Sequence, residues 1–149
     1  MKTILNWTNK MAFEATADGQ TVLMDAKAPI GSGSAMTPKE LVAAGLGGCT
    51  AMDVIALLKK HKQDYKEFQV DVDIETSTGA QPMIFTKATI TFWATGTIDK
   101  NIYVDAARLS QTKFCGVSAM LSKAFPIHYV VMLNNEKIGE GMAEFSNTK

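Results

Sequence analysis

Residues 37–53 read TPKELVAAGLGGCTAMD and predict the start of a long, apolar helix. Thr37 can cap this helix, Pro38 suits its first position, and Glu40 stands three residues after the threonine, as in a capping box. The segment that follows carries almost no charge, so we expect the first two-thirds of the helix to be buried on all sides. The basic residues at 59–62 would complement the negative end of the helix dipole, which predicts an end near His61.

The glycines of this helix make it costly to form. Gly45, Gly47 and Gly48 fall within four residues. Together they lower the stability of the helix by roughly 2–3 kcal/mol relative to alanine. Close approach of another backbone is the usual compensation, so we expect a second element to pack tightly here. Cys49 follows directly, which places a thiol at the narrowest part of that contact. The alternative is that Cys49 is only a small core hydrophobe, and the residues around it do not decide between the two.

Hydrophobic alternation predicts strands on both sides of the helix. Before it, residues 2–8, 11–17 and 20–26 form strands, with Asp18-Gly19 as a hairpin turn, and residues 27–36 form an exposed, flexible loop. After it, residues 67–76 and 83–97 form two long strands and residues 127–134 a third, while the end through Lys149 adds a short edge strand or frays. The chain therefore reads as a single domain, residues 1–149, with strands around one long helix in each half.

A second helix is predicted over residues 99–125, and the second cysteine lies within it. We expect a break near Cys115-Gly116, because glycine costs about 1 kcal/mol inside a helix. The Cys115 thiol would then stand at the N-terminus of the next helical piece, where free N–H groups lower a thiol pKa, and Lys113 could add to this effect. The alternative is again a buried cysteine that only packs.

Composition excludes several classes of function. Fifteen basic and fifteen acidic residues give a formal net charge of zero, which removes the electrostatic attraction to nucleic acid and to acidic membranes and makes self-association easier. The sequence shows no signal-peptide pattern and no apolar run of membrane-spanning length. Two cysteines without such a signal indicate free thiols in a reducing compartment, the cytoplasm. Without a Cys-x-x-Cys pair or paired histidines, we expect no metal and no cofactor.

The two cysteine segments together resemble the motifs of a known family. Residues 37–49, TPKELVAAGLGGC, resemble the first cysteine motif of the OsmC/Ohr family, and residues 113–118, KFCGVS, resemble the second, usually Cys-Pro-Val-Ser. The order of strands and helices is similar from Trp7 to Met132, and residues 47–54 resemble one branch of that family in particular. The resemblance implies an α+β fold, with antiparallel sheets around two long cysteine-bearing helices in an intertwined homodimer.

The same resemblance implies a chemistry for the two thiols. Cys49 would reduce an organic or hydrogen peroxide and become a sulfenic acid, and Cys115 would condense with it to a disulfide. A dithiol such as a lipoyl group would restore both thiols. The protein would then be a thiol-dependent peroxidase with a role in the oxidative stress response.

The sequence also departs from the family where its peroxide-reducing members activate the first cysteine. Those members bring an arginine from the N-terminal strands to the thiol and hold it with a glutamate ten positions before the cysteine. Here that position is a lysine, and no arginine precedes Arg108. Charged residues near the cysteines are therefore the candidates to shape the thiol environment: Lys39, Glu40, Asp53 and Lys113. Of these, Asp53 lies one turn after Cys49 and would raise the pKa of its thiol if close and ionised.

Two functions of different classes therefore stay open. The first is the peroxidase described above, which uses Cys49 and Cys115. The second is a dimer that keeps the OsmC fold and both thiols but binds a small molecule or senses redox state, without peroxidase activity. A purely structural interaction protein is a third reading, which predicts that replacing both cysteines changes neither stability nor redox behaviour.

Overall fold

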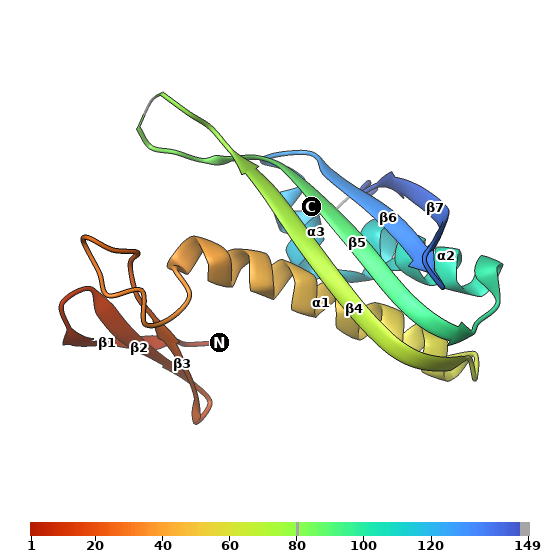
Figure 1. The fold of residues 1–149 in the computed structure, drawn as a ribbon, viewed down its shortest axis with the longest axis horizontal. Coiled ribbons are helices and arrows are strands. Elements are labelled where there is room, and N and C mark those ends of the chain that lie inside the picture. The colour runs from red at the N-terminus through yellow and green to blue at the C-terminus, as the bar shows by residue number, and fades with distance from the viewer. Residues whose placement is uncertain (80, 147–149) are drawn as a thin grey trace. The chain divides into compact units, whose positions relative to one another are not determined.

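The computed structural model describes residues 1–79 and 81–146 of the chain (Figure 1). Backbone contacts divide the chain into two compact units, Met1–Ala44 and Gly45–Lys149, with the boundary inside the first long helix. Each unit is described by itself below. That residues 1–149 act as one domain stays a prediction.

The first unit contains a three-stranded antiparallel sheet. Its strands β1 (Ile4–Asn9), β2 (Ala12–Ala17) and β3 (Gln20–Met24) pair in the order β1-β2-β3. The predicted hairpin turn is confirmed, because Asp18 and Gly19 both have positive φ angles, 49° and 77°, as a tight two-residue hairpin turn requires. Large apolar side chains of this sheet stay exposed, among them Trp7 at 65% and Leu23 at 54%.

The loop after β3 is built around one buried carboxylate. Asp25 is only 2% exposed and accepts hydrogen bonds from the backbone N–H groups of Ala26, Ser32 and Ser34 and from the Ser34 hydroxyl, at 2.7–3.1 Å. The backbone N–H of Ser34 is the largest cause that lowers the pKa of Asp25. Residues 27–36 are largely exposed, as predicted, but the sequence analysis missed this fixed centre of the loop.

Helix α1 (Pro38–Lys60) begins with the predicted capping box. The Thr37 backbone N–H donates to Glu40 Oε2 at 2.7 Å, and the Glu40 N–H donates to Thr37 Oγ1 at 3.3 Å. We expected the first two-thirds of this helix to be buried on all sides, and for a single copy of the chain this expectation is wrong. Leu46 and Val54 are fully buried, but Met52 is 74% exposed, because the rest of the second unit packs on only one side of this part of the helix.

The second unit is built on a four-stranded sheet. Strands β4 (Asp64–Thr76), β5 (Phe85–Thr97), β6 (Ile127–Leu133) and β7 (Glu136–Met142) pair in the order β4-β5-β6-β7. The pairs β4–β5 and β6–β7 are antiparallel, as predicted. The pair β5–β6 is parallel, because helices carry the chain back between these strands. Strand β7 is the expected edge strand, and residues 147–149 of the predicted end lie outside the described residues.

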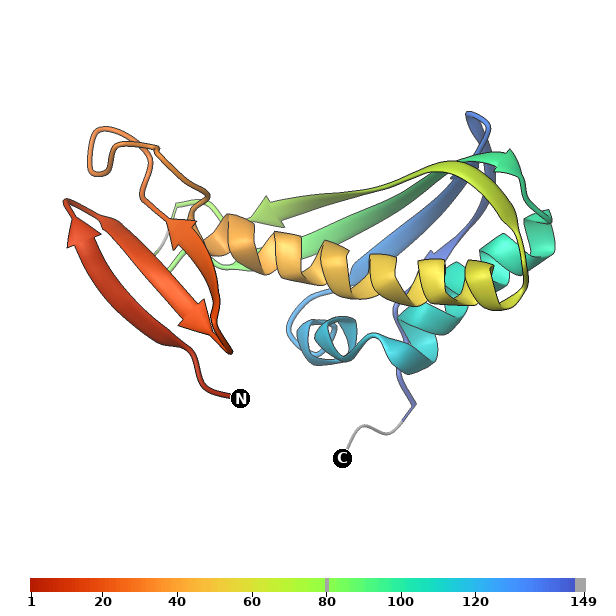
Figure 2. The same cartoon turned by 90° about the horizontal axis from the view of Figure 1, so that it is seen from below.

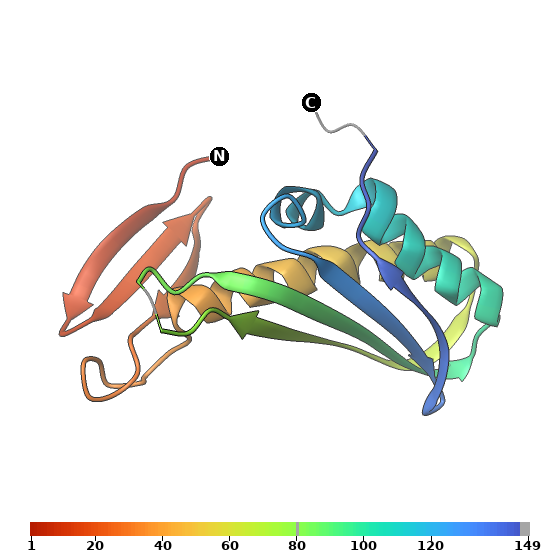
Figure 3. The same ribbon diagram turned by 90° about the horizontal axis from the view of Figure 1, so that it is seen from above.

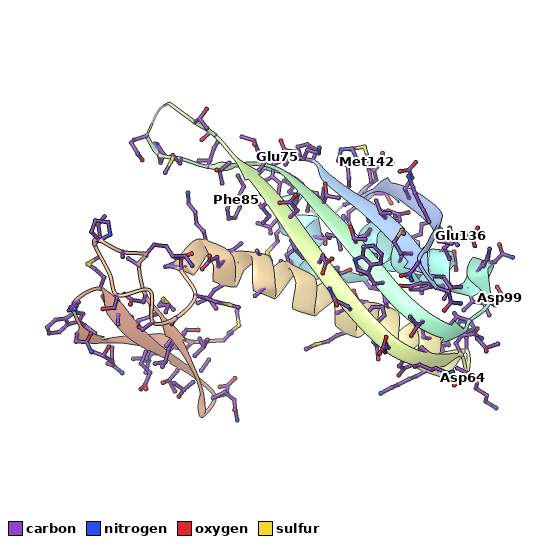
Figure 4. All side chains as sticks on the ribbon, viewed as in Figure 1. Asp64, Glu75, Phe85, Asp99, Glu136 and Met142 are labelled. Atoms are coloured by element: carbon purple, nitrogen blue, oxygen red, sulfur yellow. The ribbon has the colours of Figure 1, made fainter. Side chains whose placement is uncertain are left out.

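The helices of the second unit cover one face of this sheet. Figures 2 and 3 show α2 (Lys100–Leu109), α3 (Gly116–Leu121) and the second half of α1 against the same face. The core lies between these two layers and includes fully buried Leu58 from α1, Phe92 from β5 and Tyr103 from α2. In Figure 4, Asp64, Asp99 and Glu136 mark one end of the sheet, and Glu75, Phe85 and Met142 mark the other.

Helix α1 is also the one helix among the described residues that is long and apolar enough to suit a membrane span. The sequence analysis found no span of that kind. Leu46, Val54 and Leu58 of this helix belong to the core of the second unit, and Asp53 in its middle is ionisable. We therefore interpret its composition as that of a core helix with one uncovered side.

Candidate functional site

The two cysteines meet inside the second unit. Cys49 lies in the middle of α1 and is partly exposed, whereas Cys115 is fully buried, and both thiols are free. The Cys49 side chain lies close enough to the Cys115 thiol to raise its pKa. The prediction that the two thiols are adjacent is thus confirmed, although 66 positions (115 − 49) separate them.

The predicted break of the second helix creates the position of Cys115. A π-helical turn, Ser110–Phe114, follows α2 directly, and Cys115 caps the N-terminus of α3. The backbone N–H of Ser118 donates to the Cys115 sulfur at 3.3 Å. The Cys115 N–H donates to the Ser110 carbonyl at 3.0 Å, the spacing of a π-helical hydrogen bond.

The expected lowering of the Cys115 pKa is wrong in direction. Burial raises the pKa of this thiol to about 11, and the adjacent Cys49 thiol raises it further. The hydroxyl and N–H of Ser118 lower it, as a helix N-terminus should, but these effects are smaller than the cost of burying a thiolate. Lys113 is exposed over the ring of Phe114, 5.4 Å from its centre.

A chain of polar side chains joins α1 to the π-helical turn beside the thiols. Thr50, Ser110 and Gln111 are fully buried. The oxygens of Thr50 and Ser110 are 2.7 Å apart, and Gln111 Nε2 donates to Thr50 Oγ1 at 2.7 Å. The Ser110 hydroxyl donates to Asp53 Oδ2 at 2.9 Å. Desolvation raises the pKa of Asp53, and the bond from Ser110 partly offsets this.

Sequence reasoning named Asp53 but missed its partners. Thr50 and Asp53 stand three positions apart in an otherwise apolar helix, and that pairing was the available signal for a buried polar contact. Ser110 and Gln111 carried no such signal, because no local pattern marks the π-helical turn in which both side chains are buried. Ser118, three residues after Cys115, belongs to the second motif, but nothing in the sequence indicated that it bonds the Cys115 sulfur.

The remaining candidate residues have other partners. Glu40 lies in the first unit, where it caps α1 and pairs with Lys27 at 2.9 Å, and the bond from the Thr37 N–H is the main cause that lowers its pKa to about 2. Lys39 lies in the same first turn, so a role of Lys39 or Glu40 at the thiols stays a prediction. Arg108 pairs with Asp105 of its own helix, and its Nε donates to the Asp105 carboxylate at 3.0 Å.

The comparisons with known proteins agree with this fold. The family model described as OsmC-like protein matches residues 31–130. The chain belongs to the OsmC-like family. Protein YhfA of Escherichia coli strain K12 is 34% identical over 129 residues, which cover 85% of this chain and 93% of YhfA. The branch that residues 47–54 resemble is that of YhfA.

Solved structures of several other proteins show the same fold. An OsmC-like protein from Mycoplasma pneumoniae superposes with a TM-score of 0.77 at 12% identity, covering 89% of this chain and 95% of that one. A hypothetical protein from Aquifex aeolicus gives 0.75 at 22% identity, with 89% and 96% covered. An organic hydroperoxide resistance protein, OsmC, from Legionella pneumophila gives 0.63 at 16% identity, again with 89% and 96% covered.

Proposed function

We propose that this protein is a thiol-dependent peroxidase in which Cys49 attacks the peroxide and Cys115 resolves the product. The observation that carries the proposal is the proximity of the two thiols, which lie on separate elements of the second unit. Membership of the OsmC-like family and the shared fold of the organic hydroperoxide resistance proteins support it. The protein would work in the cytoplasm, where thiols stay reduced.

The two cysteines differ in the way these roles require. Cys49 is partly exposed, so a peroxide can reach its sulfur, whereas Cys115 is fully buried. With its pKa raised to about 11, Cys115 holds its proton at neutral pH and is a poor first nucleophile. It is instead placed to attack a sulfenic acid formed on its neighbour.

The proposed cycle has three balanced steps. The Cys49 thiol and a peroxide ROOH give Cys49 sulfenic acid and the alcohol ROH. The sulfenic acid and the Cys115 thiol then give the Cys49–Cys115 disulfide and water. A dithiol reductant of the lipoyl type returns both cysteines to thiols and leaves as its own disulfide.

Thiol titration tests this proposal. One equivalent of cumene hydroperoxide should consume two thiols per chain, because both cysteines end in one disulfide. The rate should exceed that of free cysteine at the same pH by at least about a hundredfold. The reason is that the protein would bind the peroxide in a position suited to attack by Cys49. A rate no faster than free cysteine would end the peroxidase claim.

We also propose that two copies assemble into a homodimer around the uncovered side of α1. Among the described residues, no atom of another element lies within 4 Å of the place a Cβ would occupy at Gly45 or Gly48, and neighbouring Met52 is exposed. By contrast, a Cβ at Gly47 would lie 2.9 Å from Val72 of the same chain, so the expected close approach is confirmed for this glycine. A second copy would give Gly45 and Gly48 the partner that one chain lacks.

Alanine at Gly48 should separate the two situations. In a monomer, Gly48→Ala should stabilise the helix by about 1 kcal/mol, because the position is open and alanine favours a helix. In the proposed dimer the added methyl group obstructs the contact, so sedimentation should show at least tenfold weaker association. Asn101→Ala, at an exposed position on α2, serves as the control. A Gly48→Ala variant that is more stable and equally associated would contradict the dimer on this face.

One observation favours a second candidate function, a small-molecule-binding or redox-sensing dimer without peroxidase activity. A pocket of about 370 Å³ between α1 and α2 has the size of a ligand site. It is lined by apolar Leu57, Ile102 and Leu109 together with His61 and Asp105. The only arginine, Arg108, is paired with Asp105 and takes no part in the thiol contact described above. A bound compound seen by native mass spectrometry would favour this function, whereas repeated peroxide turnover with dihydrolipoamide would count against it.

A further inference from the structure

The proposed chemistry makes no direct use of the polar chain Gln111–Thr50–Ser110–Asp53 in the second unit. Thr50, Ser110 and Gln111 are fully shielded from solvent, and three contacts in the chain join polar atoms 2.7–2.9 Å apart, beside a longer one of 3.4 Å from Gln111 Nε2 to Ser110 Oγ. Buried polar groups cost stability unless they are bonded, so such a chain needs a reason.

Counting hydrogens gives the chain one direction. An ionised Asp53 can only accept, so the Ser110 hydrogen points to the carboxylate. The contact between Thr50 and Ser110 must then use the Thr50 hydrogen, and Gln111 Nε2 supplies the hydrogen that Thr50 accepts. Each of the three contacts therefore has one hydrogen, and the chain ends on Asp53.

The chain ties together the two backbone segments that carry the thiols. Thr50 directly follows Cys49 in α1, and Asp53 lies one turn further along the same face. On the other side, the carbonyl of Ser110 accepts the hydrogen bond of the Cys115 N–H. Ser110 is thus bonded to both segments. Its hydroxyl donates to the Asp53 carboxylate, and its carbonyl accepts from the Cys115 N–H.

We propose that Asp53 is a positioning residue which, through the Ser110 hydroxyl, holds the Cys115 sulfur against Cys49 and so promotes formation of their disulfide. Asp53 acts as a hydrogen-bond acceptor rather than as a charge at the thiols. The proposal rests on the proposed function only in that this disulfide is one step of its cycle.

Glutathione tests this role without any peroxide. In glutathione buffers, the two thiols and one oxidised glutathione give the Cys49–Cys115 disulfide and two reduced glutathiones, and the equilibrium constant is the effective concentration of the thiol pair. Ser110→Ala and Asp53→Ala should each lower this constant at least tenfold. Asp53→Asn should stay within about threefold of the wild type, because the amide oxygen still accepts from Ser110.

Matched controls separate positioning from general damage. Asp105→Ala removes an exposed carboxylate from α2, and Ser122→Ala removes a partly buried hydroxyl that donates to the Ala119 carbonyl. Both should leave the constant unchanged. Thermal unfolding of the reduced proteins shows which variants fold, and Ser110→Ala, the loss of a single oxygen, carries the test if Asp53→Ala does not fold.

The outcomes distinguish this inference from the proposed function. If the wild type forms the disulfide in glutathione and both alanine variants match it, the positioning role is wrong even where peroxide activity is present. An Asp53→Asn variant as weak as Asp53→Ala would show that the charge matters and would overturn the acceptor role. If the variants weaken the disulfide as expected but peroxides do not react, the positioning role stands and the peroxidase proposal fails.

Discussion

Replacing Cys49 with serine is expected to abolish the reaction with peroxides, whereas replacing Cys115 with serine should allow one peroxide per chain and then stop. Serine at position 49 is not a nucleophile towards peroxides at neutral pH. Serine at position 115 leaves the first step intact, but the sulfenic acid on Cys49 has no neighbouring thiol to condense with. Turnover with dihydrolipoamide should fall at least a hundredfold in both variants.

Mass spectrometry after trapping with dimedone distinguishes the two losses. The Cys115→Ser protein should gain the adduct on Cys49, and the Cys49→Ser protein should gain none. Thr112→Ser, a conservative change in the same π-helical turn, should behave like the wild type and is the control. A Cys49→Ser protein that still consumes peroxide would show that Cys115 is the attacking thiol. Its burial and its raised pKa would then not prevent the attack.

The sequence predicted best those features that depend on neighbouring residues. The capping box of Thr37 and Glu40 formed as expected, because both groups lie in the same turn. The Asp18-Gly19 turn and the break before Gly116 followed from local preferences in the same way. The pairing of Cys49 with Cys115 is a distant contact, and only the resemblance to a family made it predictable.

The features that sequence reasoning missed depend on what packs around a residue. The pKa of Cys115 was expected to fall because a helix begins there, but the burial that raises it comes from other elements of the fold. The partners of Asp53 belong to a π-helical turn, and no local pattern marks that turn before its tertiary contacts exist. The sequence also could not predict that Gly45 and Gly48 have no close neighbour in the described part of the chain, because glycine content alone does not say which element packs against a helix.

Oxidation to the Cys49–Cys115 disulfide is expected to stabilise the protein by about 4 kcal/mol. The bond would close a loop of 66 positions (115 − 49), and the chain-entropy model gives this value for the conformational entropy that the unfolded chain loses. For a chain of 149 residues such a change corresponds to a rise in Tm of roughly 10 °C. Thermal unfolding of the reduced and the diamide-oxidised protein, at equal concentration, measures it.

The size of this rise also reports how well the thiols are placed. Because Cys49 and Cys115 are already in contact, the bond should need little rearrangement of α1 and the turn before α3, and most of the entropic gain should survive. The Cys115→Ser protein treated with diamide should show no rise, which excludes other effects of the oxidant. An oxidised wild type with an unchanged or lower Tm would mean that strain in the folded state costs at least as much free energy as the restraint on the unfolded chain provides. In that case the contact between the thiols would be a packing feature and not a prepared step of catalysis.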